Sequence, residues 1–180
     1  MKTLASFTLL LSVALVSAAE PAGTPTTISG MKGTAPAAWV KEKPSNLLRS
    51  YQFKLPALVK DLADAELAVY PESTPKYESK FKEWKDTFLL PEDKTADDIS
   101  KVSKLEVNGN MVHVLDVNGT WKYRERPRDP SSKEMLKADY RVVWYVLIGK
   151  EETTHIRLSG PKKVVDSHIA SVEKWIKELK

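Results

Sequence analysis

Few residues in this chain have the types and spacing that catalysis requires. The three histidines, His113, His155 and His168, form no pair at i, i+4 or at another common metal-ligand spacing. His113 shares a predicted strand face with Met111 and Leu115, which favours a partly buried imidazole over a metal ligand. His155 is expected on the polar face of its strand. We therefore predict neither a metal site nor a cofactor.

Motifs for nucleophilic or phosphate chemistry are also missing from the sequence. It contains no Gly-x-Ser-x-Gly, no Ser-x-x-Lys followed by its partner motifs, no Gly-x-Gly-x-x-Gly and no Walker motif. It has no cysteine, which excludes a disulfide scaffold, a thiolate zinc site, a cysteine nucleophile and a diacylglycerol anchor. We predict no catalytic residue and a protein that is not an enzyme. A hydrolase with unrecognised residues is the alternative.

One segment, Thr120 to Lys137, stands out by its charge. It holds six basic and three acidic side chains, and it begins with two aromatic residues. Two prolines, Pro127 and Pro130, favour a long, semi-rigid loop. Arginine beside aromatic residues suits contact with a carboxylate, a phosphate or another protein. The residues predicted to bind a partner are Trp121, Tyr123, Arg124, Arg126 and Arg128. A solvated loop without a partner is the alternative.

The N-terminus has the three parts of a secretory signal peptide over residues 1–19. Lys2 supplies the positive charge, an apolar run follows from Leu4 to Val16, and cleavage after Ala18 or Ala19 satisfies the small-residue rule. The apolar run is shorter than the roughly 20 residues that a membrane-spanning helix needs. We predict export to a bacterial periplasm or the extracellular space, with no transmembrane segment.

Composition then divides the exported chain in two. Residues 20–38 are mostly alanine, proline, glycine and threonine, so we predict a flexible linker. Residues 39–180 form one predicted domain. The 180-residue chain has 28 basic and 24 acidic side chains, and removal of Lys2 with the leader leaves a net charge of +3. An excess this small gives no reason to expect nucleic-acid binding.

The first elements of the domain have clear patterns. Leu47–Leu55 alternates between apolar and polar residues and predicts a strand, and Ala65–Tyr70 predicts a second. A helix follows, with aromatic side chains on one face at Tyr77, Phe81, Trp84 and Phe88. We expect this stripe to pack on a sheet. The alternative is that it does not close fully and leaves a crevice beside Trp144 or Trp175.

Three further strands are predicted as a meander: Val102–Val107, Met111–Val117 and Thr120–Arg124. Asn108-Gly109 and Asn118-Gly119 separate them, and Asn-Gly suits two-residue hairpin turns because both positions need positive φ.

The last strands and the second helix indicate the fold class. Tyr140–Gly149 is apolar on both faces, which predicts a central strand covered on both sides. Thr153–Ser159 alternates, with Ile156 and Leu158 inward and His155 and Arg157 outward. A helix after Gly160-Pro161 repeats apolar residues at helical spacing up to Leu179. We predict an α+β fold with a mostly antiparallel sheet flanked by helices.

The chain resembles a group of exported, uncharacterised bacterial proteins with the Mog1/PsbP-like fold, common in planctomycetes. The likeness rests on Trp39, Lys43-Pro44-Ser45-Asn46, Arg49, Phe53-Lys54-Leu55-Pro56, Ala65–Tyr70, Trp84, Phe88, Val107-Asn108-Gly109, Val117–Trp121, Tyr140-Arg141 and Leu158–Pro161. It implies an α/β/α arrangement and supplies no catalytic residue. Other proteins of this fold are mainly adaptors and assembly factors.

Two functions follow as hypotheses. The first is an exported, non-enzymatic interaction domain, an adaptor or assembly factor, whose partner is another envelope protein. The second is a small-molecule or lipid-binding periplasmic module in which an apolar ligand occupies a crevice beside the aromatic helix. Fold alone does not decide between them.

Overall fold

The computed structural model describes residues 22–72, 76–125, 129–149 and 152–180. The predicted signal peptide, residues 1–19, lies outside this part of the chain. The elements are β1 (Thr24–Ile28), β2 (Met31–Ala35), β3 (Val40–Glu42), β4 (Tyr51–Leu55), β5 (Ala65–Glu72), α1 (Tyr77–Lys85), β6 (Phe88–Leu89), β7 (Ser100–Val107), β8 (Asn110–Arg124), β9 (Glu134–Ile148), β10 (Thr153–Pro161) and α2 (Lys162–Lys177).

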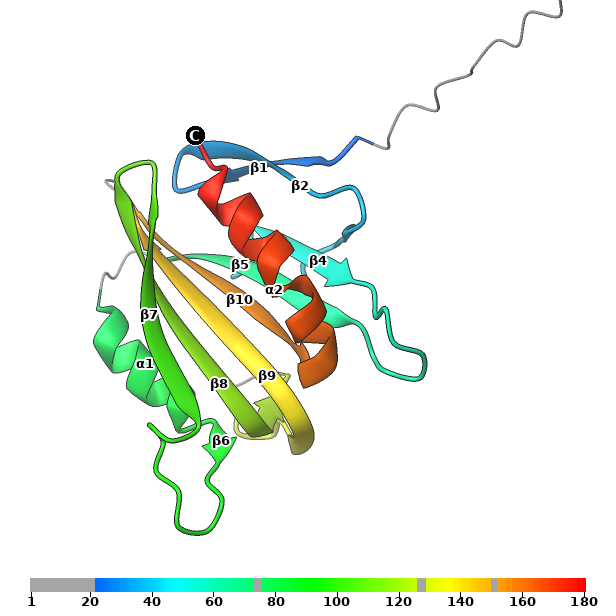
Figure 1. The fold of residues 1–180 in the computed structure, drawn as a ribbon, viewed down its shortest axis with the longest axis vertical. Helices are drawn as coiled ribbons and strands as arrows, with labels where there is room; N and C mark the ends of the chain where they lie inside the picture. The colour runs from blue at the N-terminus through cyan, green and yellow to red at the C-terminus, as the bar shows by residue number, and fades with distance from the viewer. Residues whose placement is uncertain (1–21, 73–75, 126–128, 150–151) are drawn as a thin grey trace, which may run out of the picture.

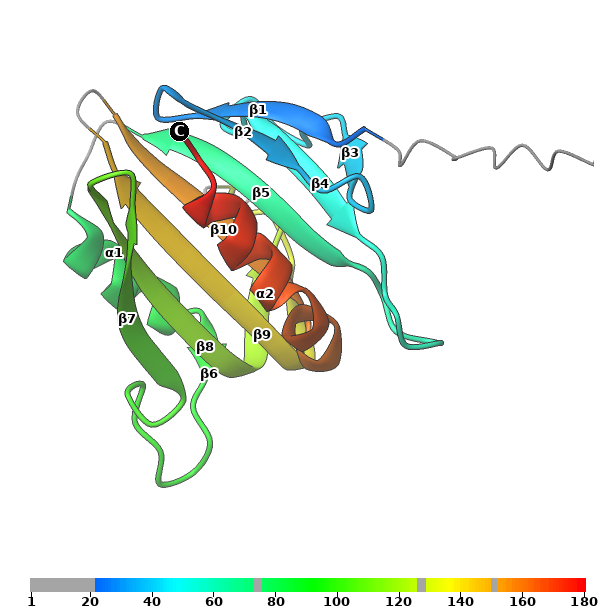
Figure 2. The same ribbon diagram turned by 45° about the horizontal axis from the view of Figure 1, so that its top comes forward.

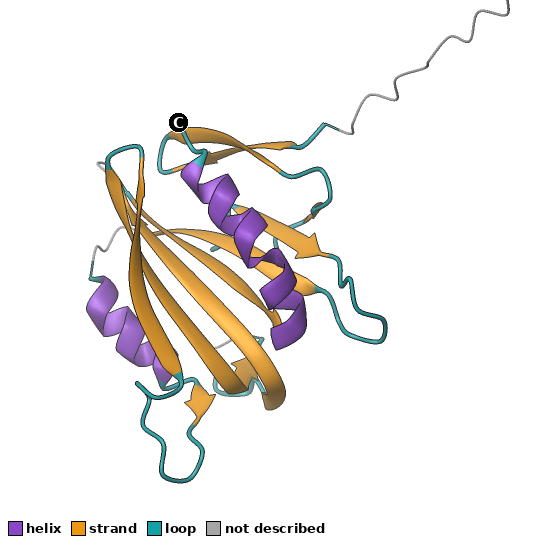
Figure 3. Cartoon of the chain, viewed as in Figure 1, coloured by secondary structure: helices purple, strands orange, loops and turns teal. Residues whose placement is uncertain are grey.

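An antiparallel sheet with a helix on each face forms the body of the protein (Figures 1 and 3). Within the described residues the strand order is β3-β4-β5-β10-β9-β8-β6, and β7 also pairs with β8. β9 lies inside the sheet, between β10 and β8, as its two apolar faces predict. Val143, Tyr145 and Leu147 pack in the core on the α2 side, and Val142, Trp144 and Val146 pack on the α1 side. The predicted α+β fold is confirmed.

The linker predicted for residues 20–38 is wrong from Thr24 onward, because β1 and β2 form an antiparallel hairpin there. Ile28, Met31 and Ala35 are buried in the core on the α2 side. The backbones of Lys32 and Lys180 exchange two hydrogen bonds, of 2.6 and 2.9 Å, which join β2 to the end of the chain. Figure 2 shows the hairpin lying across the C-terminal end of α2. The signal overlooked is Ser29-Gly30, a positive-φ turn between two short alternating runs.

The predicted meander is half correct. Asn108 and Gly109 both have positive φ and form the tight turn between β7 and β8. The second predicted turn, Asn118-Gly119, is wrong because β8 continues through it to Arg124. Pairing with β9 continues on both sides of an irregularity between Gly119 and Trp121. Between these pairs β9 has one residue more than β8, and Asp139 of β9 has a positive φ of 52°, so Gly119 lies in a strand beside a bulge rather than in a turn.

The continuous strand also removes most of the loop predicted for Thr120 to Lys137. Trp121 pairs with Lys137 and Arg124 pairs with Glu134, so both ends of the segment are strand. Trp121 is buried, with its indole nitrogen 3.2 Å from the hydroxyl of Thr87. Arg126 and Arg128 lie outside the described residues.

The aromatic helix ends earlier than predicted, at Lys85, and Phe88 lies in the short strand β6. Phe81 and Phe88 are nevertheless buried together against the sheet, as expected of a packing stripe. Trp84, in the last turn of α1, is only half-buried. The α1 layer therefore covers one part of its sheet face and leaves another part open beside Trp84.

Candidate ligand pocket

The open part of this face is a pocket of about 610 Å³. Its floor comes from β5, β8, β9 and β10, one side comes from the last turn of α1, and another from the segment before β4. The residues that line it are Ser45, Asn46, Leu48, Arg49, Tyr70, Glu72, Trp84, Tyr123, Arg124, Glu125, Asp129, Trp144, His155 and Arg157. It lies beside Trp144, one of the two places where the sequence allowed a crevice.

Two indole rings form one wall of the pocket. Trp84 of α1 and Trp144 of β9 are stacked, with ring centroids 5.2 Å apart and planes 6° apart. Trp144 is fixed from a second side by Phe88, which meets it edge-on at 6.4 Å. Its position follows from the alternation of β9, because Val142 and Val146 point to the same face. The wall is flat, apolar and held by packing.

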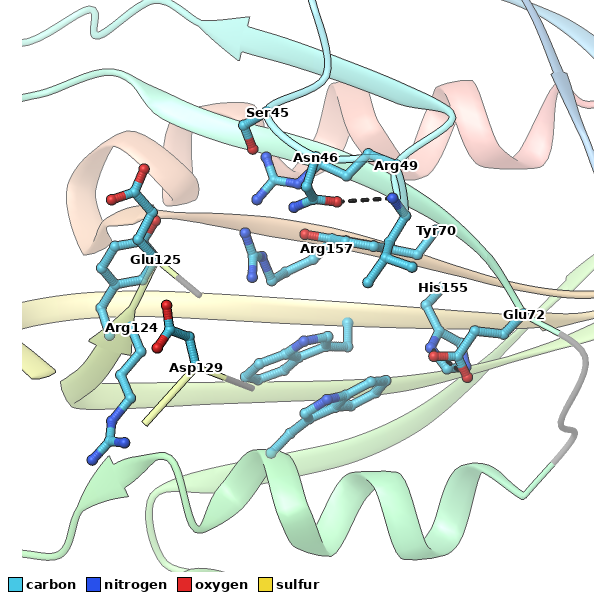
Figure 4. A pocket seen from close by; sticks show the side chains of 14 residues that line it. Ser45, Asn46, Arg49, Tyr70, Glu72, Arg124, Glu125, Asp129, His155 and Arg157 are labelled. Atoms are coloured by element: carbon cyan, nitrogen blue, oxygen red, sulfur yellow. Dashed lines mark hydrogen bonds and ion pairs between the residues drawn. The ribbon is translucent and has the colours of Figure 1, made fainter. Parts of the chain in front are cut away.

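Two arginines that share one carboxylate lie next to this wall. Arg49 Nη1 donates to Glu66 Oε2 at 2.8 Å, and Arg157 Nη2 donates to Glu66 Oε1 at 2.6 Å. Arg49 Nη1 also donates to Gln52 Oε1 at 2.7 Å. Both guanidinium groups lie over the ring of Tyr70, at 5.4 and 5.7 Å from its centroid. Figure 4 shows the two arginines at the centre of the pocket.

Burial and charge act in opposite directions on this triad. Burial alone would raise the pKa of Glu66, but the charges and hydrogen bonds of Arg157 and Arg49 outweigh it and lower that pKa. Burial would likewise lower the pKa of Arg49, but the hydrogen bond to Glu66, together with the charges of Tyr70 and Glu66, outweighs it and raises that pKa. A guanidinium keeps its proton in proteins, and the lowered pKa keeps the Glu66 carboxyl ionised at neutral pH. The triad therefore carries one net positive charge.

The far end of the pocket holds His155 and Glu72 (Figure 4). His155 is buried, and its Nδ1 lies 3.5 Å from Glu72 Oε2. Burial lowers the pKa of His155; Glu72 opposes that shift and Lys80 adds to it. Its Nε2 has no hydrogen-bond partner within the described residues. The imidazole is therefore neutral at pH 7, and it meets the ring of Trp84 edge-on at 5.1 Å.

The residues predicted to bind a partner are divided between the interior and the rim. Trp121 is buried, 5.4 Å from the guanidinium of Arg157, so it supports the pocket rather than a contact surface. Tyr123 lines the pocket, and Arg124 lies at its exposed edge in an ion pair of 3.3 Å with Glu134. A role of this segment in binding a protein partner stays a prediction.

Sequence reasoning missed Arg49, Glu66 and Arg157 as site residues. Arg157 and His155 were expected to face outward, and that placement is wrong: His155 is buried, and the side chain of Arg157 is only 15% exposed. The alternation of β10 separates the two faces correctly, but it does not reveal that α1 and the segment before β4 cover the second face. The available signal was a charged residue between two apolar neighbours in each of two predicted strands, Glu66 in one and Arg157 in the other.

No group of three or more histidine or acidic side chains is arranged to hold a metal ion in the described part of the chain. What the pocket does offer is hydrogen-bond donors and flat apolar surface. Chemically, this arrangement suits binding and orientation of a small molecule.

Two buried histidines make stability depend on pH. Burial lowers the pKa of His113, which stacks on Tyr77 at 3.6 Å; Lys104 lowers it further and Glu78 opposes it. Burial also lowers the pKa of His155. The unfolded chain, with an ordinary histidine pKa near 6.5, then binds more protons than the native state below that pH. Native stability should therefore fall from pH 7 to pH 5, by at most about 1.4 kcal/mol per pH unit for each histidine.

Urea unfolding at pH 7, 6 and 5 measures this dependence. The variant His113→Gln/His155→Gln should lose most of the slope. Carboxyl groups with lowered pKa values, such as Glu66 and Asp166, also stabilise the native state. That stability is lost only when the pH falls to about 4.5, the ordinary carboxyl pKa, and below. An unchanged slope in the double variant would show that other groups carry the pH dependence.

Comparison with known proteins identifies the type of fold. No protein-family model and no curated protein matches the chain. Among solved structures, the cyanobacterial PsbP of Synechocystis sp. PCC 6803 matches 95% of this chain and 98% of its own, with a TM-score of 0.52 and 8% sequence identity. The fold is PsbP-like. A Pseudomonas aeruginosa protein of unknown function matches 88% of this chain and 96% of its own, with a TM-score of 0.45 and 15% identity.

At these identities the PsbP-like likeness concerns the fold and no activity.

Proposed function

We propose that this protein is a non-catalytic binding module that takes a small molecule with a flat apolar part into the pocket beside Trp84 and Trp144. The stacked pair of indoles in a pocket of about 610 Å³ is the observation that carries the proposal. Ligand pockets commonly have volumes of about 300–1,000 Å³ and combine apolar walls with a few polar groups. This favours the second of the two functions that the sequence allows.

The proposal places the protein outside the cytoplasm. Its support is the predicted signal peptide, residues 1–19, and the resemblance to exported bacterial proteins. Within the described residues, no helix combines the length and the apolar character needed to cross a bilayer. The ligand would then be a molecule of the periplasm or of the surroundings.

NMR of the tryptophan indole N–H groups tests the proposal with a control inside the same molecule. The chain has five tryptophans, and each gives one indole signal that a Trp→Phe variant assigns. Addition of a flat probe, naphthalene-2-carboxamide or naphthalene-2-carboxylate, should shift the signals of Trp84 and Trp144. The signals of Trp39 and Trp175, which meet edge-on at 5.5 Å in the core on the other face, should stay in place.

The outcome separates pocket binding from general adhesion. Saturable shifts confined to the pocket side support the proposal. Equal shifts of all five signals, or no shift with any flat probe at millimolar concentration, would contradict it.

A further inference from the structure

We infer that the ligand of this pocket carries an acidic group, a carboxylate or a comparable oxyanion, which Arg49 and Arg157 bind while its flat part lies against the indoles. This deepens the proposed function and rests on it. The inference starts from the charge of the triad. Two guanidinium groups share the single carboxylate of Glu66, so one positive charge has no counter-charge within the triad.

The arginines also have hydrogen-bond donors to spare. A guanidinium has five N–H groups. Glu66 accepts from one terminal nitrogen of each arginine, Nη1 of Arg49 and Nη2 of Arg157, and Gln52 accepts from Arg49 Nη1 as well. The other terminal nitrogen of each arginine has no acceptor within the described residues. Both Nε atoms are buried and also without an acceptor there. A ligand oxyanion would supply the acceptors that this part of the protein lacks.

The two side chains are already fixed before a ligand arrives. The side chain of Arg49 is 6% exposed and that of Arg157 is 15% exposed. Tyr70 lies against both guanidinium groups, and Trp121 lies against that of Arg157. Because little side-chain freedom is lost on binding, more of the interaction energy appears as affinity. A water-poor surrounding also strengthens a charge-assisted hydrogen bond.

Acidic residues at the edges of the pocket would favour the opposite kind of ligand, a cation. Glu72 lies beside the neutral His155, Glu125 is exposed at the rim, and Asp129 accepts hydrogen bonds from Ser131. If these carboxylates dominated, the pocket would prefer a cationic ligand. The arginines lie at the centre, next to the indole wall, so the acidic group is the one that the interior favours.

Three naphthalene probes that differ only in charge test the inference. Naphthalene-2-carboxylate, naphthalene-2-carboxamide and 2-naphthylmethylammonium are titrated while the indole signals of Trp84 and Trp144 are followed. The carboxylate should bind at least about tenfold more tightly than the amide, as expected for hydrogen bonds to a charged group. The ammonium probe should bind most weakly.

Variants connect that preference to the arginines. Arg157→Gln should remove most of the preference for the carboxylate and leave the affinity for the amide nearly unchanged. Arg141→Gln is the matched control, because Arg141 is similarly buried, at 17% exposure, but pairs with Asp116 and Asp166 on the α2 side. Arg157→Lys keeps the charge and should keep part of the preference. If Arg157→Gln fails to fold, the ratio of the wild-type affinities for the carboxylate and the amide probe still tests the inference.

The results distinguish this inference from the function on which it rests. Equal binding of carboxylate and amide at Trp84 and Trp144, or tightest binding of the ammonium probe, would overturn the acidic ligand and leave the binding module in place. No shift with any of the three probes would overturn both.

Discussion

Removing residues 22–38, so that the folded part of the chain begins at Trp39, should lower the free energy of unfolding by about 3–6 kcal/mol. The reason is that Ile28 and Met31 are almost fully buried, at 1% and 8% exposure. Full burial of one such side chain stabilises a protein by about 1.5–3 kcal/mol. The truncation also breaks the backbone pairing of Lys32 with Lys180 and uncovers Trp175. Urea unfolding of the chains 22–180 and 39–180 measures the difference.

If the shorter chain does not fold, a point variant in the hairpin tests the same prediction. Ile28→Ala should cost about 2–5 kcal/mol, the range for a large aliphatic side chain removed from a core. Thr27→Ala, one residue earlier on the exposed face of β1, should cost less than about 0.5 kcal/mol. Equal stability of the long and short chains would mean that the hairpin behaves as the linker that its composition suggested.

Glu66→Gln should destabilise the protein by about 2–3 kcal/mol, because it leaves two buried guanidinium groups without a carboxylate. Breaking a fully buried ion pair costs about 3–5 kcal/mol. The side chain of Glu66 is 33% exposed, so we expect a smaller loss. The same substitution should strengthen binding of naphthalene-2-carboxylate severalfold, since the probe would then be the only anion paired with the two arginines. Urea unfolding with and without the probe measures both effects.

Glu134→Gln provides the matched control for that variant. Glu134 pairs with Arg124 at the exposed rim, where both side chains are about 40% exposed. Exposed pairs contribute about 0–1 kcal/mol, so this variant should change stability little and leave affinity for the probe nearly unchanged. A Glu66→Gln variant with unaltered affinity for the carboxylate would mean that the triad does not contact the ligand.

The sequence predicted the fold well where one pattern implied one environment. β9 is apolar on both faces over its C-terminal half, and only a strand covered on both sides satisfies that pattern. Asn108-Gly109 forms the turn that its residue types favour. Asn118-Gly119 has the same residue types but lies within β8, because β9 pairs with both residues and continues to pair beyond them. Turn chemistry is local, and long-range pairing overrides it.

The pocket could not be predicted from the sequence, because its residues come from distant segments of the chain. Glu66 lies on β5, Arg157 on β10 and Arg49 on the segment before β4. Period-two alternation says which residues share a face, but not whether water or another element covers that face. The basic segment stands out by its composition, yet it supplies only the edge of the pocket: Tyr123, Arg124, Glu125 and Asp129 from its described residues.

A crystal structure of the protein with naphthalene-2-carboxylate tests the central claim most directly. The expected complex has the naphthalene ring against Trp84 and Trp144, and the carboxylate within hydrogen-bond distance of both Arg49 and Arg157. A probe whose carboxylate points to solvent, or one bound only on another surface while this pocket contains none, would contradict the account.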